Sequence, residues 1–258
     1  MATGGALSGR TIAVTRPADQ AEALCRAIEE AGGRAFRFPL LEIVPVTDPA
    51  VFAPVAARLD TFDLAFFVSP NAVEHGLAGL RQVRPWPPGL HVAAVGQGSA
   101  RALNAHGFAD VIVPAVGFDS EAVLALPAFS AEAVRGCAVL VVRGNAGREL
   151  LGRTLAARGA HVEFLSCYHR RCPAADPAPL LELAACGSLD ALSVTTAEGV
   201  DHLARIVGDA GLACLSGVPV FVSHPRIAAR CHLHGLEQTI ASGAGDDALL
   251  RAFIAFFS

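Results

Sequence analysis

Ile12-Ala-Val-Thr-Arg16 and Val139-Leu-Val-Val-Arg143 decide the fold of this chain, because the second segment repeats the first at an offset of 127 residues, counted from Ile12 to Val139. Asp63 recurs as Asp190 at the same offset. Because the offset stays constant over so long a stretch, we interpret the chain as two copies of one structural unit. Two like domains predict a ligand site in the cleft between them.

The composition agrees with two domains. The 258 residues are 53% hydrophobic and 17% charged, which is enough for two sizeable cores. The 20 basic and 24 acidic residues give a net charge of −4, without a basic run that could follow a phosphate backbone, so we expect no nucleic-acid partner. All the basic residues are arginine, which excludes a Schiff-base lysine, a pyridoxal phosphate anchor and a P-loop lysine.

Neither a membrane span nor an export signal is visible in the sequence. No apolar run reaches the roughly 18 residues that a spanning helix needs, and the segment from Met1 to Arg10 lacks a charged start followed by an apolar core. We therefore expect a soluble, cytoplasmic protein without a membrane partner. Its seven cysteines are expected to be reduced and mostly buried.

Short β-rich runs alternate with longer Ala-, Leu- and Arg-rich stretches of helical period. This alternation predicts parallel sheets that are covered by helices on both faces. The expected strands are 11–15, 34–39, 63–68, 91–95, 111–114, 138–142, 161–167, 190–194, 219–222 and 238–241.

Two proline-rich stretches, Val44 to Pro49 and Cys172 to Pro177, occupy equivalent places in the two copies and predict a pair of hinges. The junction between the copies, near Ala128 to Gly136, has no proline, so the chain is not expected to divide there. Two consecutive domains of about equal length would also fit the repeat. The division favoured by the hinges makes one domain from 46–168, the other from 1–42 with 174–258, and hinge strands from 43–45 and 169–173.

Short strings along nearly the whole chain point to a known family by their order and spacing. They are Val14-Thr-Arg-Pro17 with Gln20, Pro39 to Ile43, Val68-Ser-Pro-Asn-Ala-Val73, Ala94-Val-Gly96 with Ser99, Asp119-Ser-Glu121, Gly147-Arg-Glu-Leu-Leu151, Arg158-Gly159, and Tyr168 with Arg170. Together they closely resemble the uroporphyrinogen-III synthase family, which closes hydroxymethylbilane into uroporphyrinogen III on the route to heme and other porphyrins.

The resemblance implies two similar doubly wound, parallel-sheet α/β domains of the flavodoxin-like type, joined by a two-stranded hinge. It also implies an enzyme with no metal and no organic cofactor. The family expels the terminal hydroxyl of a linear tetrapyrrole, and the resulting azafulvene cation closes through a spiro intermediate that inverts ring D. Unguided closure gives the uninverted isomer, so the enzyme must mainly hold the substrate in one reactive conformation.

Tyr168 is the only tyrosine of the chain and lies beside the second hinge. By analogy with the family's tyrosine at this position, we expect its phenol to assist departure of the hydroxyl, although a tyrosine that only packs would look the same. Ser69 and Asn71 follow a strand and open a helix, where they could bind substrate, cap the helix, or do both. Ser99 follows Gly96-x-Gly98 and could bind a carboxylate, although close turn packing also explains this motif.

The repeat nominates Thr195 and Thr196 as substrate contacts, because they follow their strand as Ser69 follows its own, while capping is the simpler account. The loop of Ser223 and His224 departs from the family, which usually has glycine near position 224 and a hydroxyl near 227. Ser223 or His224 could compensate, although a lone histidine in such a loop is more often structural.

Arginine side chains are the remaining candidates for the substrate's eight carboxylates. Arg16, Arg143 and Arg148 are possible contacts, but solvated or interdomain ion pairs are the stronger explanation. The run from Cys231 to His234 carries three soft ligands in four residues, yet on a helix they point in different directions, so we expect no metal site there.

Two other classes of protein share parts of this pattern. A two-lobed binding or sensor protein without catalysis has like α/β lobes, but it would need an export signal or a DNA-binding segment. A transferase built from two Rossmann-like halves would need a nucleotide fingerprint with an acidic ribose partner. We therefore expect a monomeric lyase whose partner is the small molecule hydroxymethylbilane.

Overall fold

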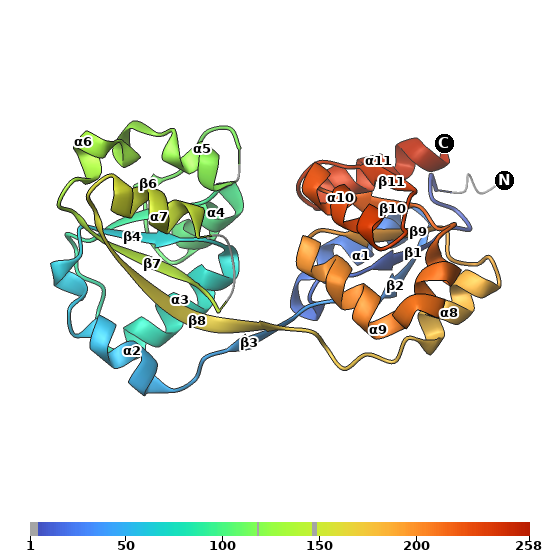
Figure 1. Ribbon diagram of the computed structural model, residues 1–258, viewed down its shortest axis with the longest axis horizontal. Coiled ribbons are helices and arrows are strands. Elements are labelled where there is room, and N and C mark those ends of the chain that lie inside the picture. The colour runs from blue at the N-terminus through green and yellow to red at the C-terminus, as the bar shows by residue number, and fades with distance from the viewer. Residues whose placement is uncertain (1–4, 118, 146–148) are drawn as a thin grey trace. The chain divides into compact units, whose positions relative to one another are not determined.

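The computed structural model describes residues 5–117, 119–145 and 149–258 (Figure 1). Contacts along the chain divide it into two compact units. Unit 1 combines Met1–Glu42 with Arg171–Ser258, and unit 2 is Ile43–Arg170. The chain therefore passes twice from one unit to the other.

Unit 1 is built on a parallel sheet in the order β11-β10-β9-β1-β2. Its strands are β1 (Thr11–Val14), β2 (Arg34–Arg37), β9 (Ala191–Val194), β10 (Val220–Val222) and β11 (Thr239–Ala241). Its helices are η1 (Ala18–Gln20), α1 (Glu22–Glu30), α8 (Ala178–Ala185), α9 (Ala197–Leu215), α10 (Pro225–Leu233) and α11 (Asp246–Phe257).

Two separate hydrophobic clusters lie on the two faces of this sheet. Ile12 and Val14 pack with side chains of α1 and α11, such as Phe253. Ala13 and Leu192 belong to the cluster that α8, α9 and α10 cover. Successive residues of β1 therefore point to opposite faces, and both faces are buried, as expected for a parallel sheet.

Unit 2 has a sheet in the order β3-β8-β7-β4-β5-β6, and β8 to β6 pair in parallel. Its strands are β3 (Glu42–Pro45), β4 (Leu64–Phe67), β5 (His91–Ala94), β6 (Val111–Ile112), β7 (Ala138–Gly144) and β8 (His161–Arg171). Its helices are α2 (Pro49–Ala56), η2 (Leu59–Thr61), α3 (Pro70–Val83), α4 (Gln97–Ala105), α5 (Ser120–Leu124), η3 (Pro127–Phe129), α6 (Ala131–Val134) and α7 (Leu150–Ala157).

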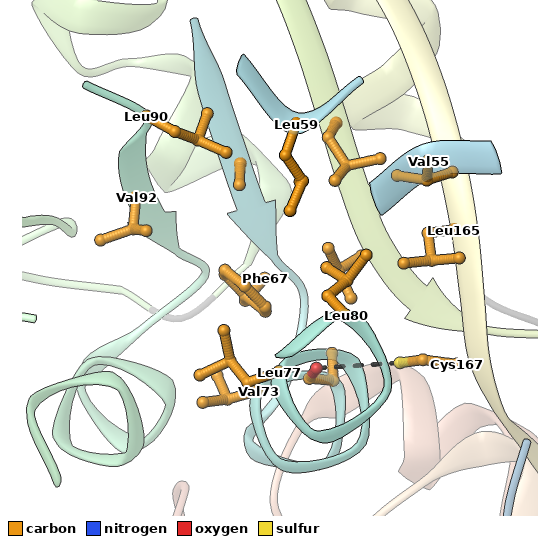
Figure 2. Close-up of a cluster of buried hydrophobic side chains, with 14 of the residues drawn as sticks. Val55, Leu59, Phe67, Val73, Leu77, Leu80, Leu90, Val92, Leu165 and Cys167 are labelled. Carbon is orange, nitrogen blue, oxygen red and sulfur yellow. Dashed lines mark hydrogen bonds between the residues drawn. The ribbon is translucent and has the colours of Figure 1, made fainter. Parts of the chain in front are cut away.

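The sheet of unit 2 is also covered on both faces. Figure 2 shows the cluster beneath α2 and α3, in which Phe67 of β4 and Leu165 of β8 meet Leu77 and Leu80 of α3. The other face packs against α5, α6 and α7. The prediction of doubly wound α/β units is therefore confirmed.

Corresponding strands pair in the same register in the two units, with residue numbers displaced by the 127 positions of the sequence repeat. Thr11 pairs with Arg34 between β1 and β2, and Ala138 pairs with His161 between β7 and β8, which is a shift of 127 at both positions. If β1 and β7 are each counted as the first strand, the sheet of unit 1 and the strands β4 to β8 of unit 2 share the flavodoxin-like strand order 2-1-3-4-5. In unit 2, β3 adds a sixth strand beside β8, and the repeated part then begins in the chain at its third strand, β4, so it is a circularly shifted copy.

Asp63 and Asp190 perform the same task in the two copies. The Oδ2 atom of Asp63 accepts the backbone N–H of Ala138 at 2.8 Å, and Asp190 accepts that of Thr11 at 2.8 Å. Each aspartate also donates its own N–H to the carbonyl of the same partner, at 2.9 Å. The repeated aspartate therefore fixes the start of the first strand beside the third.

Within the described residues, no helix is long and apolar enough to cross a membrane. The longest helix, α9, is interrupted at Gly208, whose φ of 65° lies in the left-handed region that favours glycine.

Candidate functional site

The strand order places a ligand site at a defined edge of each sheet. In doubly wound sheets, ligands bind beyond the carboxyl ends of the strands, where the strand order reverses. That point lies between β7 and β4 in unit 2 and between β1 and β9 in unit 1. Five of the polar residues predicted from the sequence follow these strands, namely Arg16 after β1, Ser69 and Asn71 after β4, and Thr195 and Thr196 after β9.

Tyr168 and Ser69 meet at this edge of unit 2. Tyr168 lies on β8 opposite Gly144, where a register shift interrupts the pairing of β7 with β8. Its phenol oxygen is 3.0 Å from the Oγ of Ser69, which also accepts the backbone N–H of Ala72 at 3.1 Å. Ser69 therefore caps α3 and orients the phenol at the same time.

The phenol of Tyr168 sits in a protected environment. The residue is 3% exposed, and burial raises the pKa of its phenol, against the opposing effect of the hydrogen bond with Ser69. The phenol is therefore protonated at neutral pH and can donate a hydrogen bond. The ring of His75 lies 5.9 Å from the Tyr168 ring, centroid to centroid.

Cys167, the neighbour of Tyr168, faces the hydrophobic cluster. Its thiol donates to the carbonyl of Ala72 at 3.7 Å (Figure 2) and to that of Arg143 at 3.4 Å. Burial raises the pKa of the thiol to about 12. A thiol with so high a pKa is a packing group and not a nucleophile.

The other candidates of unit 2 differ in accessibility. Asn71 is the second residue of α3 and is half-buried. Ser99 is 2% exposed, on the side of α4 that faces the core. Of these two side chains, only that of Asn71 is open to a bulky ligand.

Three threonines line a small hollow at the corresponding edge of unit 1. The hollow has a volume of about 20 Å³ and is lined by Thr15, Pro17, Leu40, Leu41, Val194, Thr195, Thr196 and Gly199. Thr196 accepts the backbone N–H of Gly199 at 2.9 Å and so caps α9. Thr15 donates its hydroxyl to the carbonyl of Ser193 at 2.5 Å.

The next loop of unit 1 contacts the same edge. The hydroxyl of Ser223 lies 3.4 Å from the carbonyl of Thr195. The Nδ1 of His224 accepts the backbone N–H of Arg226 at 3.1 Å, so this side chain caps α10. Ile227, near which the resemblance led us to expect a hydroxyl residue, is 5% exposed within the hydrophobic core.

The two predicted arginines that the structure describes have partners within their own units. Arg16 pairs with Asp246 at the start of α11. The guanidinium carbon of Arg143 lies 5.3 Å from the centre of the Phe164 ring, beside a hollow of about 390 Å³ that α7 borders. Tyr168, by contrast, lies against α3. Arg148 falls outside the described residues.

The run from Cys231 to His234 forms no ligand set. His232 contacts the hydroxyl of Thr239 at 3.0 Å, and His234 contacts Asp201 at 3.0 Å. Over the ranges that the structure covers, no three His, Cys, Asp or Glu side chains are grouped as a metal site would require.

Sequence reasoning missed three residues at these edges. His75 is one helical turn beyond Ala72, a spacing that the helix expected at Ser69 would have revealed. His202 is 6% exposed, and its Nδ1 donates to the carbonyl of Leu40 at 2.7 Å. Leu41 lies 127 residues before Tyr168, so the repeat alone could have nominated it.

Comparison with known proteins finds related sequences. The family model described as uroporphyrinogen-III synthase HemD matches residues 22–251. A uroporphyrinogen-III synthase of Salmonella typhimurium is 40% identical over 161 residues, which are 62% of this chain and 65% of the relative. The match thus covers slightly less than two thirds of that relative. A second one, from Proteus mirabilis, is 37% identical over 164 residues, 62% of this chain and 80% of the relative.

Solved structures support the same fold. A mutant uroporphyrinogen III synthase from Thermus thermophilus aligns with a TM-score of 0.67 and 22% identity, over 95% of this chain and 97% of that chain. The Helicobacter pylori protein aligns with a TM-score of 0.59 and 15% identity, over 96% of this chain and 99% of that chain. From the family model, the relatives and the shared fold, we conclude that this chain belongs to the uroporphyrinogen-III synthase family.

Proposed function

We propose that the protein is a uroporphyrinogen-III synthase, which cyclises hydroxymethylbilane to uroporphyrinogen III with loss of water and inversion of ring D. The observation that carries the proposal is the buried Tyr168 phenol, 3.0 Å from Ser69 at the carboxyl edge of the unit 2 sheet, in a chain of this family. In this proposal the enzyme is a monomeric, cytoplasmic lyase of porphyrin biosynthesis.

The phenol has the properties that the first step needs. A departing hydroxyl leaves more easily as water, so a proton donor beside it lowers the barrier. Tyr168 remains protonated because burial disfavours its phenolate. The phenol donates its hydrogen bond to the leaving oxygen, and Ser69 holds the phenol in place.

Hydroxyl and N–H donors would bind the substrate's carboxylates. Ser69, Asn71, Thr195, Thr196 and Ser223 lie just beyond strand ends, and all five are at or next to a helix N-terminus, where backbone N–H groups and the helix dipole favour anions. His224, Arg16, Arg143 and Arg148 complete the proposed side-chain contacts, while Ser99, whose side chain is buried, would contribute through the backbone N–H groups at the start of α4. His224 and Arg16 also bind groups within unit 1, so we give them a supporting role.

The proposal includes the domain division expected from the sequence. One domain is 46–168, the other is 1–42 with 174–258, and 43–45 and 169–173 are hinge strands. The separation of the chain into two compact units, with crossings at residues 42–43 and 170–171, supports this division.

The direct test is an assay of product isomers. Purified protein is given freshly made hydroxymethylbilane without added cofactor, the products are oxidised, and uroporphyrin isomers I and III are separated. We expect an excess of isomer III over a protein-free control. If isomer I alone forms at the uncatalysed rate, the proposed activity is wrong.

A further inference from the structure

The hollow of unit 1 lies at the position that Tyr168 occupies in unit 2. Each residue that lines it has a counterpart in unit 2, displaced by 127 positions. In the order Thr15, Pro17, Leu40, Leu41, Val194, Thr195, Thr196 and Gly199, the counterparts are Val142, Gly144, Cys167, Tyr168, Phe67, Val68, Ser69 and Ala72. Leu41 therefore replaces the tyrosine, and Thr196 replaces the serine that binds its phenol.

The strand register and the caps place the residues around Thr15 and Thr196 in equivalent positions to those around Val142 and Ser69, and the constant sequence offset extends this correspondence to Leu41 and Tyr168. Ile12 pairs with Ala191 as Val139 pairs with Leu64. Thr196 caps its helix by accepting the N–H three residues on at 2.9 Å, as Ser69 does at 3.1 Å. The two edges thus present a hydroxyl in the same local geometry.

The two capping hydroxyls have the same remaining capacity for hydrogen bonds. Each oxygen accepts one backbone N–H, which leaves one lone pair and its own O–H. At Ser69 the phenol oxygen of Tyr168 uses one of these, at 3.0 Å. At Thr196 the counterpart side chain is that of Leu41, which is 7% exposed and has no polar atom.

We propose that the unit 1 hollow is a binding site for a single water molecule, which hydrogen-bonds to Thr196 where a phenol oxygen bonds to Ser69. Its volume of about 20 Å³ exceeds the roughly 10–15 Å³ that one water needs. The lining supplies the hydroxyls of Thr195 and Thr196. Each unit then presents one small hydroxylic donor at its carboxyl edge, from tyrosine in unit 2 and from water in unit 1.

The water site predicts how two substitutions of Tyr168 change the activity, and this prediction rests on the proposed function. Tyr168→Leu makes the unit 2 edge resemble that of unit 1, so a water can bind Ser69 and donate to the leaving hydroxyl. Tyr168→Phe keeps the ring, which fills the space and excludes water. We expect isomer III formation to fall about tenfold in Tyr168→Leu and about a hundredfold in Tyr168→Phe. Equal losses, or a more active Tyr168→Phe variant, would contradict the consequence.

The water site itself is tested without any assay of activity. A high-resolution crystal structure should show one ordered water within hydrogen-bond distance of the Thr196 hydroxyl. Thr196→Ser keeps the hydroxyl and should retain the water, whereas Thr196→Val should lose it. If the crystals show other buried waters but none at Thr196, the assignment is wrong, whether or not the protein makes isomer III.

A second variant tests the shape of the hollow in solution. Leu41→Tyr should place a phenol beside Thr196 and expel the water. Burial should then raise the pKa of the new phenol above the ordinary value for tyrosine. Leu233→Tyr is the matched control, because Leu233 is 75% exposed. If both new phenols titrate alike while the variants remain folded, the hollow does not accept a phenol and the equivalence with Tyr168 fails.

Discussion

The phenol oxygen of Tyr168 and the Oγ of Ser69 lie 3.0 Å apart, although the two residues are 99 positions apart in the chain. The contact ties β8 to the turn between β4 and α3. Because Ser69 also accepts the N–H of Ala72 in the first turn of α3, the phenol lies beside the positive end of that helix. A phenol in this position can donate a hydrogen bond to an oxygen whose negative charge changes during a reaction.

Tyr168 should titrate above the ordinary value of 10.0 for a tyrosine, because burial raises the pKa of its phenol. Its folded-state pKa is raised, so the stability it contributes is fully present below the unfolded value and is lost as the pH rises through the folded value. The protein has one tyrosine, so ultraviolet absorbance of the phenolate follows this residue alone. A midpoint at or below 10.0 in the folded protein would show that the phenol is accessible to water.

Gly144→Ala should displace the phenol, because a Cβ at this position would lie 2.6 Å from the Cε2 atom of Tyr168. We expect kcat/KM for isomer III to fall about tenfold, or about 1.4 kcal/mol, with a shifted phenol titration. Gly89→Ala is the control, since a Cβ there meets nothing within 4 Å. Unchanged titration and activity in Gly144→Ala would mean that the ring position is unimportant.

Ser69→Ala removes a helix cap and a phenol partner together. The lost cap should cost about 1 kcal/mol of unfolding free energy. Ser130→Ala removes a cap of similar geometry, in which the hydroxyl accepts the N–H of Ala133 at 3.2 Å, without touching Tyr168. Denaturant unfolding should therefore show similar losses in the two variants. Only Ser69→Ala should reduce isomer III formation and raise the pKa of Tyr168 further, because the bond with Ser69 lowers it.

Asp63→Ala and Asp190→Ala should destabilise the protein by about 1–2 kcal/mol each, because each leaves the N–H of a strand start without its charged acceptor. Asparagine at either position keeps an acceptor oxygen and should cost less. Urea unfolding measures the losses, with the exposed Asp110→Ala as control. Losses no larger than that of the control would show that water replaces the aspartate.

Cys186 should react with iodoacetamide in the folded protein well before Cys167 and Cys231. The hydrogen bond with Ser188 lowers the pKa of the exposed Cys186 thiol. Burial raises the pKa of Cys167 to about 12 and that of Cys231 to about 11. Mass spectrometry of timed samples gives the order of labelling. Early labelling of Cys167 in folded protein would imply that the cluster beneath α3 opens.

Much of the fold could be predicted from the sequence because its signals are local. Strand runs such as that at Ile12 and the repeated aspartates are visible as short patterns, and the constant offset indicates one architecture for both units. The strand boundaries were less accurate: β2 ends at Arg37, two residues before the predicted end at position 39. Phe38 and Leu40 still donate to the carbonyls of Val14 and Thr15, but two residues of one segment now span a single residue of the other, so the regular ladder ends before them.

The candidate residues could be listed from the sequence, but their partners could not. Ser69 and Tyr168 were both nominated, yet nothing local shows that they touch. Arg16 was nominated as a carboxylate contact, and the structure pairs it with Asp246, 230 residues away. The helix expected after Ser69 could have placed His75 one turn along it, but the contact of its ring with that of Tyr168 is visible only in the tertiary structure.

The sequence by itself determined the repeat, the helices and strands, and the family. It also shows that Leu41 in one copy corresponds to Tyr168 in the other. These features depend on residue type and on spacing along the chain. Tertiary structure decided which side chains meet, because strand order brings β8, β7 and β4 together from distant parts of the chain. Tertiary structure also decided the consequence of having leucine at position 41. Only the packing of the neighbouring residues shows that a side chain shorter than tyrosine leaves a space the size of one water beside Thr196.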